Sequence, residues 1–103
     1  MGPGRADLLE AIQREGSISA AGRSLGMSYR YTWLSVDSMN RCFKEKLVET
    51  TRGGRPKGGA SLTPAGQRVL EGYRSLEAAI DHAADPHLKA LLSLMRDEPL
   101  PAG

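Results

Sequence analysis

Apolar side chains near the start of the chain follow the period of an α-helix. Leu8, Leu9 and Ile12 lie on one side of such a helix. Gly16 then interrupts the pattern, as a glycine just past the last turn of a helix does. The pattern therefore predicts a first helix over about residues 7–15.

A second helix of barely two turns is predicted next. Ser19 is placed to be its N-cap, and Gly26 would end it. Ala21 and Leu25, four residues apart, share its expected buried face. Gly22 supplies a small residue where a following helix would cross. A helix this short is marginal alone, so packing must hold it in place.

The third predicted helix is capped by Ser28 and runs to about Lys44. At 100° per residue, its large apolar side chains gather on one face. This expected buried face carries Tyr29, Thr32, Trp33, Val36, Met39, Asn40 and Phe43. Trp33 and Phe43 are thus expected in the core rather than as platforms for stacking bases. Cys42, at the edge of the face, is expected to be half-buried.

The opposite face of this helix is polar and basic. It carries Arg30, Tyr31, Leu34, Ser35, Ser38 and Arg41, with one acid, Asp37, at its margin. Arginine and hydroxyl side chains bind phosphates and base edges, and an apolar side chain can meet a thymine methyl group. Together with the N-cap Ser28, this face is a candidate surface for DNA.

The apolar period then changes to that of a β-hairpin. Residues 47–51 form a short segment rich in β-branched side chains, as a strand does. Residues 60–62 can form the returning strand, and a glycine-rich basic segment joins the two. Arg52, Arg55 and Lys57 lie in this joining segment. They are the expected phosphate contacts of a wing, the name we use for the hairpin.

The last part of the sequence predicts amphipathic helices. Thr63-Pro64 is an N-cap followed by the proline favoured at the first helical position. Asp85-Pro86 is expected to break the helix, which then restarts. The apolar positions alternate four and three residues apart, which is typical of a seam between two helices. The expected dimer interface comprises Val69, Tyr73, Leu76, Ile80 and Ala83, then Leu88 and Leu91, with Leu92 and Met95 alongside.

These elements define the expected architecture. The fold class is mainly α, a winged helix-turn-helix with a three-helix core, a β-hairpin wing and C-terminal dimerisation helices. Residues 1–63 would form the DNA-binding region, 64–96 the dimerisation helices of the same domain, and 97–103 a disordered tail.

Charge and composition support a nucleic-acid partner. Net charge is only +2, but residues 1–58 hold ten Lys/Arg against six Asp/Glu. From Thr50 to Leu70 there are four basic residues and no acid. One cysteine and no long apolar run favour a cytoplasmic protein without a membrane partner.

An enzyme or metalloprotein is not expected. The sequence shows no nucleophile with a paired base, no carboxylate pair in an apolar setting and no dinucleotide fingerprint. His82 and His87 are five residues apart, which does not suit a metal pair on one helical face. No cofactor is predicted.

The segment around the second helix resembles two regulator families, the LysR type and the ModE (molybdate-responsive) type. The shared motifs are Gly16-Ser17-Ile18-Ser19, Leu25-Gly26-Met27-Ser28 and Leu62-Thr63-Pro64-Ala65-Gly66. Ser28-Tyr29 with Trp33, the Met39-Asn40 pair and the glycine-rich basic wing favour the ModE type. The resemblance covers residues 7–83 and implies a homodimer that presents two recognition helices to a palindromic DNA site.

The resemblance does not extend to molybdate sensing. ModE-type regulators carry C-terminal β-domains for the oxyanion, and the helices that end this sequence do not match them. A DNA-binding domain without those β-domains is therefore expected, and the effector is open. One alternative from another class is a winged helix that docks on a protein and no longer binds DNA. A sensor with a ligand pocket between dimer helices is a third possibility.

Overall fold

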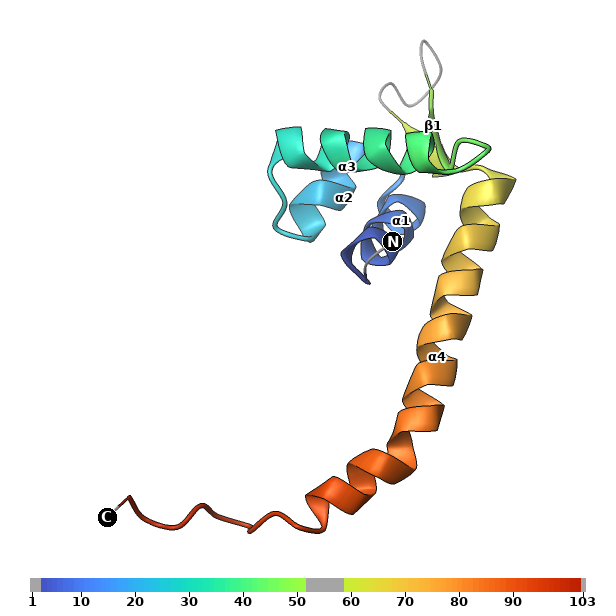
Figure 1. Ribbon diagram of the computed structural model, residues 1–103. Helices are drawn as coiled ribbons and strands as arrows, with labels where there is room; N and C mark the ends of the chain where they lie inside the picture. The colour runs from blue at the N-terminus through green and yellow to red at the C-terminus, as the bar shows by residue number, and fades with distance from the viewer. Residues whose placement is uncertain (1–2, 52–58, 103) are drawn as a thin grey trace.

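Three helices pack around one core, and a fourth leads away from it (Figure 1). The computed structural model describes residues 3–51 and 59–102. The elements are α1 (Pro3–Glu15), α2 (Ile18–Ser24), α3 (Tyr29–Cys42), β1 (Val48–Thr50), β2 (Ala60–Leu62) and α4 (Pro64–Leu92). The order and kinds of element confirm the winged helix-turn-helix class.

The ends of the short helices are set by serine and glycine. Ser17 is the N-cap of α2, because its hydroxyl accepts a hydrogen bond from the Ala20 amide at 3.1 Å. The expected N-cap, Ser19, was wrong, since it already lies in the first turn. Gly16 and Gly26 have φ angles of +76° and +70°, the left-handed conformation that ends a helix tightly.

The core is built around α1, whose apolar face is wholly enclosed. Leu8, Leu9 and Ile12 are buried, and Ala6 and Ala11 allow neighbouring elements to approach. Ile18 from α2, Met39 from α3 and Leu47 before β1 close over this face. Leu25, expected on the buried face of α2, is 39% exposed. The helix ends at Ser24, so residue 25 leaves the helical face at the C-cap.

The hairpin is antiparallel and is tied to the helices at both strands. Val48 pairs with Leu62 and Thr50 with Ala60. The Ala60 amide also donates to the carbonyl oxygen of Gly16 at 2.8 Å, which fixes β2 to the junction of α1 and α2. The predicted phosphate contacts Arg52, Arg55 and Lys57 lie outside the described residues.

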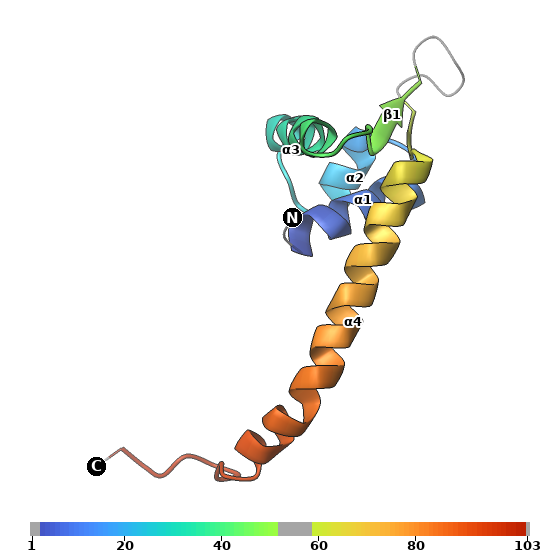
Figure 2. The same ribbon diagram turned by 45° about the vertical axis from the view of Figure 1, so that its right-hand side comes forward.

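The long helix α4 begins as the sequence predicts and ends differently. Thr63 caps it by accepting from the Gly66 amide at 3.0 Å, and Pro64 is in its first turn. The expected break at Asp85-Pro86 is wrong, because one helix continues through Pro86 to Leu92. Proline removes one hydrogen bond and crowds the preceding turn, which bends a helix without ending it. The axis of α4 does bend toward its C-terminal end in both views (Figures 1 and 2).

Candidate nucleic-acid interface

The crossing of α2 and α3 depends on Gly22. A Cβ atom at this position would overlap the side chain of Thr32, which is buried in α3. The Thr32 hydroxyl donates to the Ser28 carbonyl oxygen at 2.7 Å, so its polar atom is satisfied inside the crossing. The small residue predicted at this crossing is therefore required by the geometry.

A narrow strip of α3 faces the core. Thr32, Val36 and Met39 are its buried residues, at spacings of four and three. The wider buried face predicted from the sequence was wrong at its margins. Tyr29, Trp33 and Phe43 are 68%, 39% and 37% exposed. The seven-residue α2 is too short to cover the flanks of a helix twice its length. Cys42, expected to be half-buried, is exposed as well.

The opposite face of α3 is open and carries the predicted DNA-binding side chains. Arg30, Tyr31 and Leu34 are exposed, while Ser35 and Ser38 are partly covered at the side. The Ser28 hydroxyl is occupied as the N-cap, accepting from the Tyr31 amide at 3.1 Å. Arg41 is paired with Asp37 at 3.0 Å. Arg30 has no carboxylate partner among the described residues, so its five donors are available.

Asn40 connects α3 to the wing, a role that the sequence analysis missed. Its Oδ1 accepts from the Leu47 amide at 2.9 Å and from the Val48 amide at 3.1 Å. Its Nδ2 donates to the Val48 carbonyl oxygen at 3.1 Å. An asparagine on the buried side of a helix, shortly before a strand, was the available signal. The wing is thus set at a defined position relative to the open face of α3.

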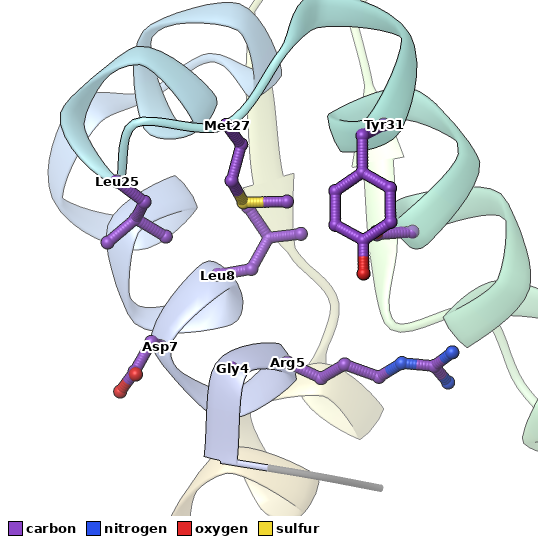
Figure 3. A pocket seen from close by; sticks show the side chains of 8 residues that line it. Gly4, Arg5, Asp7, Leu8, Leu25, Met27 and Tyr31 are labelled. Atoms are coloured by element: carbon purple, nitrogen blue, oxygen red, sulfur yellow. The ribbon is translucent and has the colours of Figure 1, made fainter.

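A hollow of about 460 Å³ lies between the start of α1 and the first half of α3. Its lining comes from α1, the turn before α3, and α3 itself: Gly4, Arg5, Asp7, Leu8, Leu25, Met27, Tyr31 and Ser35. Figure 3 shows the Arg5 side chain extending across the hollow below the Tyr31 hydroxyl. Arg5 was not among the predicted DNA contacts, because in the sequence it stands apart from the basic segments.

The predicted dimer seam divides into two parts along α4. Val69 and Tyr73 are half-buried against the chain's own core. Leu76, Ile80, Leu88 and Leu91 are each more than half exposed, and Ala83 is exposed too. Arg74 ties α4 to α1 through ion pairs to Asp7 at 2.9 Å and to Glu10, and it also pairs with Glu77 one turn further along α4. The Arg74 guanidinium donates hydrogen bonds to the carboxylates of Glu77, Asp7 and Glu10, and these bonds raise the pKa of Arg74 above its usual value.

Over 3–51 and 59–102, no group of three or more His, Cys, Asp or Glu side chains gathers as metal ligands do. No helix of this part of the chain is long and apolar enough to cross a bilayer.

Known proteins resemble this chain over most of its length. The sequence model for bacterial regulatory helix-turn-helix proteins of the lysR family matches residues 5–67. The chain is 45% identical over 80 residues to the molybdenum-pterin-binding protein MopB of Rhodobacter capsulatus, covering 78% of this chain and 30% of MopB. It is 44% identical over 81 residues to the molybdenum transport protein ModE of Azotobacter vinelandii, covering 79% of this chain and 30% of that protein. The matched part is therefore less than a third of either relative.

Solved structures share the fold at low identity. A crystal structure of the CbnR DNA-binding domain in complex with DNA aligns with a TM-score of 0.69 at 21% identity, covering 88% of this chain and 99% of that one. Full-length LysG from Corynebacterium glutamicum aligns with a TM-score of 0.65 at 23% identity, covering 92% of this chain and 31% of that one. At these identities the likeness concerns the fold alone.

Proposed function

The chain belongs to the lysR family of bacterial regulatory helix-turn-helix proteins, and we propose that it acts as a sequence-specific, homodimeric regulator on a palindromic operator. The observation that carries this proposal is the arrangement of α3. Three buried side chains pack α3 against the core, and the opposite face of the helix exposes Arg30, Tyr31 and Leu34 to solvent. A helix of this kind fits the major groove of DNA, where its first turns reach the base edges.

The wing gives this interface a second contact. Asn40 holds β1 against α3, which would bring the wing beside the open face. The basic residues that the sequence places between the strands would then meet backbone phosphates, which carry no sequence information. In this proposal α3 reads the bases, and the phosphates are contacted by Arg52, Arg55 and Lys57.

The proposed dimer rests on α4. From Leu76 onward its apolar side chains have no partner among the described residues, and a long helix rarely exposes so continuous an apolar face. A second copy would cover the same face of both helices, as two-fold symmetry requires. Two recognition helices related by that axis would match a palindromic site.

The relatives also bear on the effector. MopB and ModE carry molybdenum in their names, but the similarity to this chain covers only 30% of each. We propose that the shared region is the DNA-binding part and that any effector acts on it from outside these residues. In calorimetry with molybdate, the purified chain should show no saturable site of micromolar affinity, and such a site would contradict this part of the proposal.

Fluorescence anisotropy tests the DNA-binding function directly. A random-sequence duplex library is first enriched with the protein, and the selected duplex is then titrated at several salt concentrations beside a scrambled one. Preference for the selected duplex of at least about a thousandfold is expected for a specific regulator. Equal, weak binding to both duplexes would instead favour a winged helix that docks on a protein.

A further inference from the structure

Arg5 is a cation held beside the recognition helix without a carboxylate partner in the part of the chain that is described. It is partly buried, and its extended side chain lies along the hollow below Tyr31 (Figure 3). An arginine can cover apolar surface with its stem while the guanidinium stays at the rim. The hollow therefore restricts the positions that the guanidinium group of Arg5 can occupy.

The nearest acid on α1 does not neutralise Arg5. Asp7 also lines the hollow, but its carboxylate is paired with Arg74 of α4 at 2.9 Å. The carboxylate of Glu10 is also paired with Arg74. Asp7 and Glu10 are therefore turned toward α4, Glu15 pairs with Arg14 at the other end of α1, and the guanidinium of Arg5 is left for a partner outside the chain.

Arg5 and the wing lie on opposite flanks of α3. Tyr31 and Ser35 line the hollow of Arg5 on one flank. Trp33 and Asn40 line a separate hollow with residues of β1 on the other flank. At 100° per residue the two pairs fall on either side of the buried strip through Thr32 and Val36.

This placement matches the borders of the major groove. A helix lying in the groove, which is about 12 Å wide, has the phosphates of one strand on each side. The wing would meet one border, and Arg5 faces the other. We propose that Arg5 binds a DNA backbone phosphate across the major groove from the wing, an inference that rests on the proposed DNA binding. Arginine binds phosphate through charge-assisted hydrogen bonds, which are stronger than neutral ones.

Two substitutions at Arg5 separate charge from packing. Arg5→Met keeps a long apolar stem and removes the charge, and Arg5→Lys keeps the charge. Arg96→Met is the matched control, because Arg96 lies exposed beyond the end of α4 and gives the same change in net charge. Binding is measured on the duplex selected with the unmodified protein, and thermal unfolding checks that each variant folds.

Arg5→Met should weaken binding to the selected and scrambled duplexes alike, by about tenfold. It should also lower the slope of log K against log salt by about one unit. Arg5→Lys should keep most of the affinity, and Arg96→Met all of it. Equal results for Arg5→Met and Arg96→Met would overturn the inference. A change of base preference in Arg5→Lys would do so too, because it would indicate base reading.

A scan with neutral phosphates locates the contact independently of any variant. Methylphosphonates are placed one at a time along both strands of the selected duplex. Lys57→Ala should remove the effect of a methylphosphonate at the phosphates that the wing contacts. In the unmodified protein, a methylphosphonate at a phosphate across the groove from these should also lower the affinity for DNA. Arg5→Met should remove the effect at that phosphate and at no other. Sensitive positions confined to the wing side would overturn the inference. If no duplex is bound at all, the proposed function fails first.

Discussion

Asn40 and Val48 are joined by two hydrogen bonds that run in opposite directions. The side-chain oxygen of Asn40 accepts from the Val48 amide at 3.1 Å, and its amide nitrogen donates to the Val48 carbonyl oxygen at 3.1 Å. One asparagine thus acts toward β1 as a neighbouring strand would, with one acceptor and one donor. Asn40 therefore couples the recognition helix to the first strand of the wing.

Replacing Asn40 by alanine should destabilise the domain. The Leu47 and Val48 amides would lose their acceptor in a partly buried place, at a cost of about 1–3 kcal/mol. Urea unfolding followed by circular dichroism measures the change in midpoint. Asn40→Asp is a second variant: it keeps the acceptor for the two amides but sets a charged oxygen against the Val48 carbonyl oxygen, so it should also be destabilised. Equal stability of all three proteins would contradict the coupling.

Gly22→Ala should cost about 1–3 kcal/mol of unfolding free energy, because the added methyl group meets Thr32. Gly72→Ala provides the contrast. A Cβ atom there meets nothing within 4 Å, so alanine should stabilise α4 by about 0.5–1 kcal/mol. Both changes are read from the same thermal or urea unfolding curves. Similar gains at both glycines would show that helical propensity, and not the crossing with α3, decides the result.

The two basic elements of the proposed interface should respond differently to substitution. Arg30→Ala should cost about 1–3 kcal/mol on the selected duplex and much less on random DNA, since arginine can grip a guanine with two hydrogen bonds. Lys57→Ala should weaken all duplexes about equally and reduce the salt slope by about one unit. Titrations against selected and scrambled duplexes distinguish these outcomes. The reverse pattern would assign base reading to the wing.

Ile80→Glu should dissociate the proposed dimer. The side chain is exposed on the apolar face of α4, and a second copy would bury a charge there without a partner. His82→Glu is the control, because His82 is also exposed but points away from that face. Sedimentation equilibrium at tens of micromolar should give a dimer for the parent and His82→Glu, and a monomer for Ile80→Glu. A monomeric parent would refute the dimer itself.

The sequence predicted the elements well because their signals are local. The cap at Ser28, the left-handed glycines and the Thr63-Pro64 start each act within one turn of chain. The buried face of α3 was overestimated at Tyr29 and Trp33, since periodicity finds the centre of a face and says nothing of how far a neighbour covers it. At Pro86 the local rule predicted a break that the longer helix avoids by bending.

The site was harder to predict where it joins distant segments. Arg5 and Tyr31 are brought to one hollow by the packing of α1 against the turn before α3, which no spacing in the sequence encodes. Asn40 was assigned to the apolar face from its helical angle. Its real partners are main-chain atoms seven and eight residues later, which are placed only when β1 returns beside α3.

The peptide groups of Leu47 join three elements at one point. Its amide is held by Asn40 of α3, and its carbonyl oxygen accepts from the Thr63 amide at 2.9 Å, directly before α4. Gly66, in the first turn of α4, passes so close to this oxygen that a Cβ atom would overlap it. The contacts of Leu47 therefore help to set the angle between α3 and α4. In the proposed dimer, that angle would determine how many base pairs separate the two half-sites of the operator. Gly66→Ala would then alter the preferred spacer length in DNA selection while leaving the half-site sequence unchanged.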